Sequence, residues 1–210
     1  MSRTALIIAA GDPPGEELIA DLREVFVIAA DGGVASARAL GLVPAVVIGD
    51  LDSALPEDLV WAEGAGAELR RFPTDKDLTD LELALEVAIA VGCDRLVATG
   101  VRGGRADHTL SNVAALAGAA RLVESVQTRS ARERTTYVTS ACSIEGPIGS
   151  IVSLLPHGGN VQGVTTDGLR WPLRRETLSP FASRGVSNEL TQSHASVSVE
   201  SGVLLVIQPR

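Results

Sequence analysis

The first part of the chain alternates short apolar runs with longer stretches in which apolar residues recur with a helical period. The apolar runs predict buried strands over residues 4–10, 25–31, 45–50 and 95–100. The periodic stretches predict helices over residues 15–24, 33–41, 78–92 and 107–123. Uniformly apolar strands that alternate with helices are typical of a parallel sheet covered on both faces.

Two of the predicted helices carry local end signals. Thr79 and Glu82 have the spacing of a capping box, in which each side chain accepts a hydrogen bond from the other residue's backbone N–H. Gly41 follows the second predicted helix. Glycine is favoured there because it readily adopts the left-handed backbone that ends many helices.

The pattern changes beyond residue 128. Residues 129–136 are charged and carry no large apolar side chain, which predicts a linker. Short runs with turn signals between them follow, over residues 149–156, 160–166, 169–173 and 195–209. The last run alternates apolar and polar residues with a period of two. These runs predict a small antiparallel β-sandwich.

We therefore expect an α/β protein with two domains. Residues 1–128 would form an open, mostly parallel, Rossmann-like α/β domain. Residues 136–210 would form the C-terminal antiparallel β-sandwich domain.

Composition limits the class of partner. The 210 residues carry a formal net charge of −8, which argues against nonspecific nucleic-acid binding because that needs a basic surface. Cys93 and Cys142 lack the spacing of a thiolate zinc site or a disulfide framework, so we expect buried free thiols, as in a reducing cytoplasm. The apolar run near the N-terminus is too short to span a membrane, and we expect no membrane partner.

Unusual polar residues follow the predicted strands, at the carboxyl ends where open parallel sheets bind their ligands. "DGG", residues 31–33, follows the second strand, and "GDLDS", residues 49–53, follows the third. Asp50 and Asp52 can turn toward one point and form a hard oxygen site suited to Mg²⁺. The alternative is an ordinary turn whose aspartates cap the backbone.

A glycine-rich loop, "GVRGGRADH" over residues 100–108, follows the last predicted parallel strand. Its glycines let backbone N–H groups approach a ligand, and Arg102 and Arg105 can pair with phosphate. The alternative is a glycine-rich turn with surface arginines. Asp107, next to His108, could be a base or a helix cap. The chain has no Walker A or GxGxxG sequence and only scattered histidines, which argues against a P-loop, a dinucleotide site and a histidine metal site.

Lys76 is the single lysine among 18 basic residues, and it lies between Asp75 and Asp77 with Asp80 close behind. Asp77 and Asp80 could add metal ligands, while Lys76 could place a compact charge on a phosphate oxygen. The alternative is a lysine that survived a drift toward arginine by chance. An acidic Mg²⁺ site next to a loop whose glycines and arginines bind phosphate is suited to phosphoryl-type transfer from a nucleotide.

The ordered set "DGG", "GDLDS", "DKDLTDLELAL" and "GGRADHTLSN" resembles the catalytic domain of the thiamine pyrophosphokinase family. "GSIVSLLP", "GVTTDGLRWPL", "GVSNE" and "SGVLLVIQ" resemble that family's thiamine-binding β domain. The resemblance covers nearly the whole chain in the right order, apart from residues 124–148, which match no pattern of the family.

The resemblance implies transfer of the β,γ-pyrophosphate of ATP to the hydroxyethyl oxygen of thiamine, with release of AMP. Asp50, Asp52 and Asp80 would hold Mg²⁺. Lys76 and Arg105 would contact the triphosphate, and Asp107 would lie near the attacking hydroxyl. The other residues that we expect to bind the nucleotide are Asp31, Gly32, Gly33, Asp77, Gly103, Gly104 and His108.

The resemblance also implies a homodimer whose active sites are shared between the α/β domain of one subunit and the β domain of the other. In that arrangement Trp171 stacks on a thiamine ring, and Thr166, Ser187 and Asn188 line or support the pocket. The alternative for Trp171 is a core position in the sandwich.

Two other functions are compatible with these residues. One is a related diphosphokinase that acts on another primary alcohol, such as a hydroxymethylpterin. The other is a non-catalytic module that binds a nucleotide or thiamine. The acidic residues and Lys76 favour catalysis, because a pure binding protein has less need of several metal-binding carboxylates.

Overall fold

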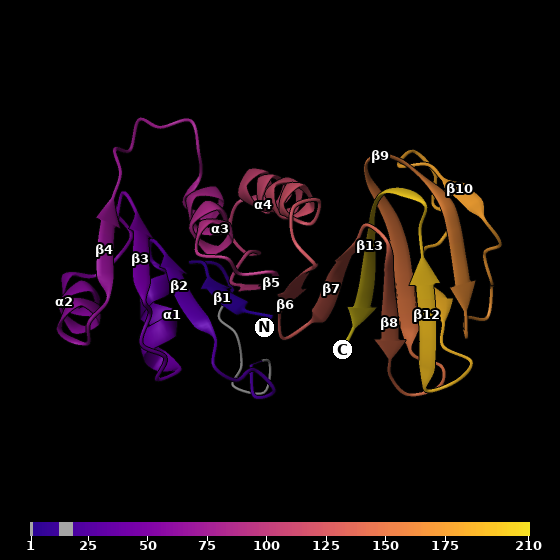
Figure 1. The fold of residues 1–210 in the computed structure, drawn as a ribbon, viewed down its shortest axis with the longest axis horizontal. Coiled ribbons are helices and arrows are strands. Elements are labelled where there is room, and N and C mark those ends of the chain that lie inside the picture. The colour runs from indigo at the N-terminus through magenta and orange to yellow at the C-terminus, as the bar shows by residue number, and fades with distance from the viewer. Residues whose placement is uncertain (1, 13–18) are drawn as a thin grey trace. The chain divides into compact units, whose positions relative to one another are not determined.

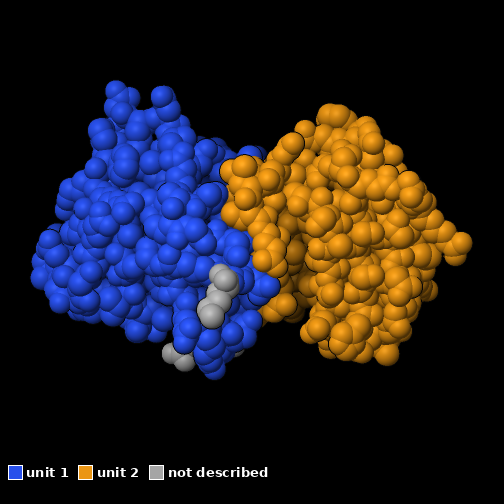
Figure 2. All heavy atoms as spheres, viewed as in Figure 1, with its two compact units in different colours: residues 1–116, 128–131 blue, residues 117–127, 132–210 orange. Residues whose placement is uncertain are grey.

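The computed structural model describes residues 2–12 and 19–210 and divides into two compact units (Figures 1 and 2). Unit 1 comprises residues 1–116 and 128–131, and unit 2 comprises residues 117–127 and 132–210. The first four residues of the helix predicted over 15–24 lie outside the described residues. The rest of that prediction is wrong, because residues 19–24 form turns and bends instead of a helix.

Unit 1 is built on parallel strands in the order β4-β3-β2-β1-β5. Their bounds are β1 Thr4–Ile8, β2 Phe26–Ala30, β3 Val46–Gly49, β4 Glu68–Arg71 and β5 Arg95–Thr99. The chain runs outward from β1 to β4 and then crosses back to place β5 on the other side of β1. The topological switch point, where open α/β sheets bind ligands, therefore lies between β1 and β5.

Helices cover both faces of this sheet, as the sequence predicted (Figure 1). Their bounds are α1 Gly33–Ala39, α2 Pro56–Gly64, α3 Asp80–Ala90 and α4 Ala106–Ala119. Ala29 and Val47 pack with α1 and α2 in one core cluster, and α3 packs on the opposite face. The pattern analysis missed α2 and β4, because α2 buries only a narrow apolar stripe and β4 is a polar edge strand.

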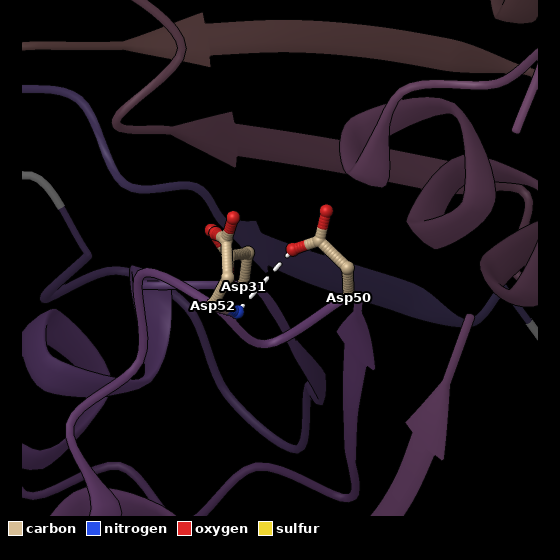
Figure 3. A group of neighbouring side chains, drawn as sticks. All are labelled: Asp31, Asp50 and Asp52. Carbon is tan, nitrogen blue, oxygen red and sulfur yellow. Dashed lines mark hydrogen bonds between the residues drawn. The ribbon is translucent and has the colours of Figure 1, made fainter. Parts of the chain in front are cut away.

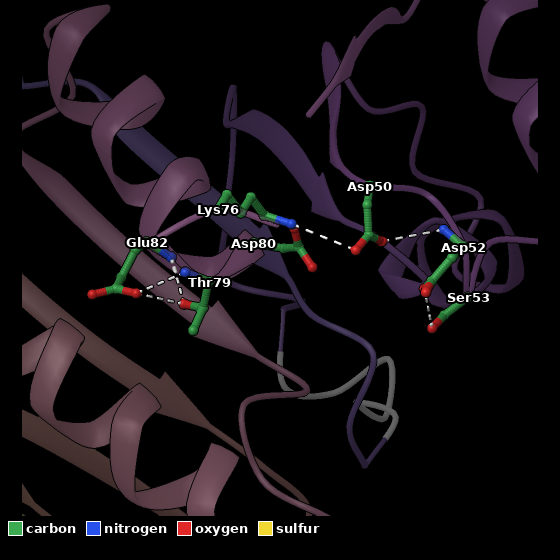
Figure 4. Close-up of polar contacts among 7 residues, drawn as sticks. All are labelled: Asp50, Asp52, Ser53, Lys76, Thr79, Asp80 and Glu82. Carbon is green, nitrogen blue, oxygen red and sulfur yellow. Dashed lines mark hydrogen bonds and ion pairs between the residues drawn. The ribbon is translucent and has the colours of Figure 1, made fainter. Parts of the chain in front are cut away.

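The predicted capping box at the start of α3 is confirmed. The Thr79 N–H donates to Glu82 Oε2 at 2.8 Å, and the Glu82 N–H donates to Thr79 Oγ1 at 3.2 Å (Figure 4). This contact fixes the first turn of α3, whose first residue is Asp80. Gly41, with φ of 67°, has the left-handed backbone expected after α1.

Unit 2 is antiparallel, and its strands pair in the order β7-β13-β9-β12-β8. Their bounds are β7 Glu133–Val138, β8 Ala141–Glu145, β9 Ile151–Asp167, β10 Glu176–Leu178, β11 Asn188–Glu189, β12 His194–Ser198 and β13 Ser201–Pro209. The long strand β9 pairs with β13 through its first part and with β12 through its last residues. One apolar core, with Val152, Leu154, Val197 and Leu204, joins these strands. The predicted fold class is confirmed.

Two details of the sequence analysis of this half are wrong. The linker expected over residues 129–136 is mostly strand, because residue 129 ends β6 (Ser125–Arg129) and residues 133–136 begin β7. Thr135 is fully buried there, so a β-branched polar residue occupies the inward position that an apolar residue would have marked. The runs over residues 149–156 and 160–166 belong to one strand, β9, and residues 169–173 make only an isolated bridge.

Both cysteines are free thiols. Cys93 is buried, and Cys142 is only partly buried against the core of unit 2. Burial raises the pKa of the Cys142 thiol to about 11, which makes it a weak nucleophile at neutral pH. Among the described residues, no helix is long and apolar enough to cross a membrane.

Candidate active site

A cleft of about 740 Å³ opens at the carboxyl ends of the parallel strands of unit 1. Its volume is in the range of small-molecule sites. The predicted site residues that line it are Asp31, Asp50, Asp52, Lys76, Asp80, Gly103, Gly104, Arg105 and His108. Residues from four separate loops thus meet in one place, as the rule for strand ends predicts.

The turn after β3 holds Asp50 and Asp52. Leu51 between them has φ of 62°, a left-handed backbone that is costly for a leucine, and its side chain is buried in the core. The burial of Leu51 anchors the turn, so both neighbouring aspartates border the cleft. The Asp52 N–H donates to Asp50 Oδ1 at 3.3 Å (Figure 3). Asp50 therefore caps the backbone of the turn, and both aspartates also border the cleft. The two interpretations of "GDLDS", a metal site and an ordinary turn, are compatible.

Asp31 ends β2 beside this turn and is also left-handed, with φ of 47°. Its N–H donates to the Ile48 carbonyl at 2.9 Å, which ties the end of β2 to β3. One carboxylate oxygen from each of Asp31, Asp50 and Asp52 lies within 4.8 Å of the other two (Figure 3). Asp31 Oδ1 is buried and accepts no hydrogen bond from any described residue. These carboxylates could hold a divalent cation.

Gly32 and Gly33 do not line the cleft, but they allow the backbone next to it to pack closely. A Cβ on Gly33 would lie 2.0 Å from the carbonyl oxygen of Ile8, so only glycine lets α1 begin this close to β1. Two other predicted residues, Asp77 and Asp107, are also absent from the lining of the cleft. Asp77 is exposed.

Lys76 reaches across the cleft to two carboxylates. Its Nζ lies 3.1 Å from Asp80 Oδ1 and 3.5 Å from Asp50 Oδ2 (Figure 4). Burial acts to lower the pKa of Lys76, but the hydrogen bond and attraction to Asp80, with the charge of Asp50, outweigh it and leave the pKa raised. Lys76 is therefore a fixed positive charge in an acidic cleft.

The pKa values of the two carboxylates beside Lys76 are shifted in opposite directions. The backbone N–H of Asp52, and then Lys76, lower the pKa of Asp50. Burial raises the pKa of Asp80, helped by the charges of Asp31 and Asp50 and opposed by Lys76. Lys76 is thus the neighbour that favours the ionised form of Asp80.

Arg105 and Asp107 form an exposed pair at the start of α4. The Arg105 guanidinium donates to both oxygens of Asp107, at 2.5 Å and 3.1 Å, and the His108 N–H donates to Asp107 at 2.9 Å. Arg105 and then His108 lower the pKa of Asp107 to about 2. A carboxylate with so low a pKa has little affinity for a proton at neutral pH and is a weak general base.

A second pocket, of about 220 Å³, lies in unit 2. It is lined by Trp171, Leu173, Ser183, Arg184, Gly185, Val186 and Asn188. The exposed fraction of Trp171 is 53%, which excludes a core position. The guanidinium of Arg170 lies 4.9 Å from the centre of its ring, a cation–π contact. An exposed aromatic side chain beside a small pocket is suited to stack on a planar ligand.

Asn188 holds the backbone of Trp171 at both ends. Its Oδ1 accepts from the Trp171 N–H at 3.0 Å, and its Nδ2 donates to the Trp171 carbonyl at 2.8 Å. Thr166 is buried, and its Oγ1 accepts from the Leu173 N–H at 2.8 Å. The Ser187 N–H donates to Ser153 Oγ at 3.0 Å. Thr166 and Ser187 therefore support the pocket from outside its lining.

Residues 22–126 match the family description "Thiamin pyrophosphokinase, catalytic domain". Residues 142–204 match "Thiamin pyrophosphokinase, vitamin B1 binding domain". The chain belongs to the thiamin pyrophosphokinase family.

Individual relatives agree with this assignment. The thiamine pyrophosphokinase of Bacillus subtilis is 27% identical in an alignment of 208 positions that covers 96% of each chain. The crystal structure of thiamine pyrophosphokinase from Bacillus subtilis has the same fold, with a TM-score of 0.87, 24% identity and coverage of 99% of both chains. The thiamin pyrophosphokinase structure from Geobacillus thermodenitrificans has a TM-score of 0.80 and 27% identity, and covers 99% of this chain and 97% of that one.

Sequence reasoning missed parts of the cleft of this family member. Gly11, just after β1, donates its N–H to the Gly100 carbonyl at 2.7 Å across the switch point. A Cβ there would lie 2.0 Å from the Arg102 carbonyl oxygen, so glycine is required. Asn112 donates from Nδ2 to the Val101 carbonyl at 2.9 Å and steadies the glycine-rich loop. Gly11 could have been predicted from the sequence, because it follows the first strand and ligands bind at the carboxyl ends of parallel strands.

Proposed function

We propose that the protein is a thiamine diphosphokinase. It transfers the β,γ-pyrophosphate of ATP to the hydroxyethyl oxygen of thiamine and releases AMP. The observation that carries the proposal is the meeting of three carboxylates, Lys76 and the glycine-rich loop in one cleft. Membership of the thiamin pyrophosphokinase family supports the choice of substrate.

The residues of the cleft fit a divalent cation. The carboxylates of Asp31, Asp50 and Asp52 converge, and the buried Asp31 Oδ1 lacks a donor within the part of the chain that the structure describes. Hard carboxylate oxygens suit Mg²⁺. We propose that Asp50, Asp52 and Asp80 hold Mg²⁺. When bound, the metal would neutralise charge on the transferring phosphates.

In this proposal the other cleft residues bind and orient the triphosphate. Lys76 gives a compact positive charge to a phosphate oxygen, and Arg105 gives a planar one. The glycines of the loop, Gly103 and Gly104, let backbone N–H groups come close. Asp107 keeps Arg105 in place, and its low pKa argues against a role as the base that removes the hydroxyl proton.

The pocket of unit 2 supplies the thiamine side of the proposal. Trp171 stacks on a thiamine ring with the face of its indole turned away from Arg170, because a second cation on the Arg170 face would be repelled. Asn188 orients Trp171, and Thr166 and Ser187 support the pocket. We propose functional domains over residues 1–128 and 136–210, in a homodimer whose active sites are shared between subunits.

One incubation tests the reaction. The protein is mixed with ATP, Mg²⁺ and thiamine, and the products are separated by chromatography. Thiamine diphosphate and AMP in equal amounts are expected. ADP in place of AMP would indicate a simple kinase. Turnover of a hydroxymethylpterin but not thiamine would indicate the related diphosphokinase, and binding without turnover would indicate a non-catalytic module.

A further inference from the structure

We propose that Arg184 selects the aminopyrimidine ring of thiamine by donating a hydrogen bond from Nη1 to a ring nitrogen, and that Glu176 holds Arg184 in position for this contact. The inference rests on the proposed function, because it names the part of the substrate that the pocket of unit 2 recognises. All the residues concerned belong to unit 2. Neither Arg184 nor Glu176 was among the binding residues that the sequence predicted.

Glu176 fixes the orientation of the Arg184 guanidinium. Arg184 Nε donates to Glu176 Oε2 at 2.6 Å, and Nη2 donates to Oε1 at 2.7 Å. Two parallel hydrogen bonds leave a planar guanidinium little freedom. They use one edge of the group, and Nη1 has no acceptor among residues 2–12 and 19–210. Because Arg184 lines the pocket, a charged donor with an open position is held beside it.

Asn188, the side-chain amide in the lining of the pocket, is already engaged by the backbone. Its Oδ1 accepts from the Trp171 N–H at 3.0 Å and from the Glu189 N–H at 2.9 Å. Its Nδ2 donates to the Trp171 carbonyl at 2.8 Å. Ser183 and Arg184 are the other hydrogen-bonding side chains of the lining besides the Trp171 indole. Arg184 is therefore the strongest donor that the pocket offers to a ligand, because it is the charged one.

The two rings of thiamine differ in what they can accept. The aminopyrimidine has two ring nitrogens with lone pairs. The ring nitrogen of the thiazolium is alkylated and positively charged, so it has no lone pair for a donor. A guanidinium has donors only, and it can therefore recognise the first ring and not the second. The pocket thus takes the aminopyrimidine, stacked on Trp171 and accepting from Arg184 at its edge.

The test compares thiamine with two analogues, in each of which CH replaces one ring nitrogen of the pyrimidine. Binding is measured by isothermal titration calorimetry of the whole chain with Mg²⁺ and a non-hydrolysable ATP analogue, so that no turnover occurs. Wild type should bind one analogue about tenfold more weakly than thiamine, because Nη1 loses its acceptor. The factor is modest because 59% of the Arg184 side chain is exposed.

Arg184→Met removes every donor of this side chain and keeps much of its length. The variant should bind thiamine about tenfold more weakly than wild type, and it should bind thiamine and the discriminated analogue equally well within about twofold. A side chain that only supported the pocket would weaken both ligands by the same factor and leave the preference for thiamine unchanged.

Arg175→Met is the matched control. Arg175 is also an arginine of unit 2 paired with a glutamate, Glu200, at 2.6 Å, but it does not line the pocket. This variant should change the affinity for thiamine less than about twofold. Glu176→Gln keeps the shape of Glu176 and removes the charge that holds Arg184. It should weaken thiamine binding about threefold in the wild type and have no effect in Arg184→Met.

Thermal unfolding separates these effects from a general loss of stability. Arg184→Met leaves the carboxylate of Glu176 without its partner. If this variant unfolds at a lower temperature than wild type, the double variant Arg184→Met/Glu176→Gln repeats the titrations, because it removes both charges of the pair. It must again bind thiamine and the analogue equally well.

Three results would overturn the inference: no thiamine binding by the wild type, equal binding of thiamine and both analogues by the wild type, or a preference for thiamine that Arg184→Met retains. The proposed function fails separately. Thiamine binding that depends on Arg184 without any thiamine diphosphate formation would leave the recognition and remove the reaction. Formation of thiamine diphosphate by a protein whose preference does not depend on Arg184 would do the reverse.

Discussion

The cleft of unit 1 and the pocket of unit 2 are built in different ways. The cleft holds Asp31 and Leu51 in a left-handed backbone and crowds carboxylates around one lysine. The pocket presents one exposed aromatic ring whose backbone is held by a buried asparagine. The first arrangement concentrates left-handed backbone and negative charge in one cleft, whereas the second positions an exposed ring, with Arg170 and Arg184 beside it, through hydrogen bonds that the free protein already makes.

This difference separates two kinds of dependence on ligand. The charged residues of the cleft lie at its surface and make few contacts that hold the fold together, so their removal should harm catalysis far more than stability. Polar residues at the pocket, such as Asn188, already have hydrogen-bond partners in the free protein. Their removal should therefore weaken the binding of one substrate and cost some stability. Variants at the two sites therefore test whether the cleft and the pocket differ in this way.

The largest effect is expected at the turn after β3. Asp50→Asn or Asp52→Asn should reduce turnover about 100-fold or more, because metal stabilisation of the transferring phosphates contributes several kcal/mol. The melting temperature without metal should fall only slightly, since Asp52 is exposed and Asp50 loses only its 3.5 Å ion pair with Lys76. Steady-state rates and thermal unfolding of the same preparations measure both. A variant with nearly full activity would remove its carboxylate from the site.

The cleft was largely predictable from the sequence, because its residues follow parallel strands and the carboxyl ends of such strands lie along one edge of the sheet. Asp31 and Asp50 are far apart in the chain, yet β2 and β3 are parallel neighbours, so the strand ends must meet. The distances were not predictable. The family resemblance implied Asp80 as the third metal carboxylate, and the structure also brings Asp31 to within 4.8 Å of the pair, while Asp80 lies beside Lys76. The position of Asp31 depends on its left-handed backbone, which no pattern of residues reveals.

The pocket of unit 2 was predictable only through the family resemblance. Asn188 and Trp171 are 17 positions apart in sequence, and they pair between the two-residue strand β11 and a loop, which are too short for a helical or strand period to show. The error at residues 129–136 has a similar origin. Thr135 is fully buried in a strand that begins with two charged residues, and its polar side chain conceals the alternation that predicts strands.

Lys76 should give the second-largest effect. Lys76→Ala should lower kcat/KM for ATP about 10- to 100-fold, because a charge on a phosphate oxygen is lost in a partly buried site. Lys76→Arg should recover only part of this loss, since a planar guanidinium does not fit where a compact ammonium sits between Asp50 and Asp80. Kinetics at varied ATP concentration measures the effect. Wild-type behaviour of Lys76→Arg would make the single lysine a compositional accident.

Trp171 should affect thiamine alone. Stacking contributes roughly 1–2 kcal/mol, so Trp171→Ala should raise KM for thiamine about tenfold and change KM for ATP much less. Arg170→Ala is a matched control that removes the cation above the ring and keeps the indole. An equal rise in both KM values for Trp171→Ala would argue against a dedicated thiamine pocket.

A mixing experiment extends this prediction to the dimer. Asp52→Asn and Trp171→Ala proteins, each with low activity at limiting thiamine, should regain activity together if each active site combines the cleft of one subunit with the pocket of the other. One of the two sites in a mixed dimer then has both intact halves. Differently tagged chains must first prove that subunits exchange. Proven mixed dimers without recovery would place both residues in the site of one subunit.

The smallest effects should come from two asparagines, one in each unit, whose side chains hydrogen-bond the backbone beside a pocket. Asn112 steadies the glycine-rich loop through the Val101 carbonyl, and Asn188 holds Trp171. Loss of such a contact costs about 1 kcal/mol, or roughly a fivefold change in an equilibrium constant. Asn112→Ala should therefore raise KM for ATP about threefold to fivefold and spare thiamine, and Asn188→Ala should do the opposite. Thermal unfolding of both variants separates these effects from a general loss of stability. If either variant raises both KM values together, the two pockets do not bind their substrates independently, and the division of labour between the units fails.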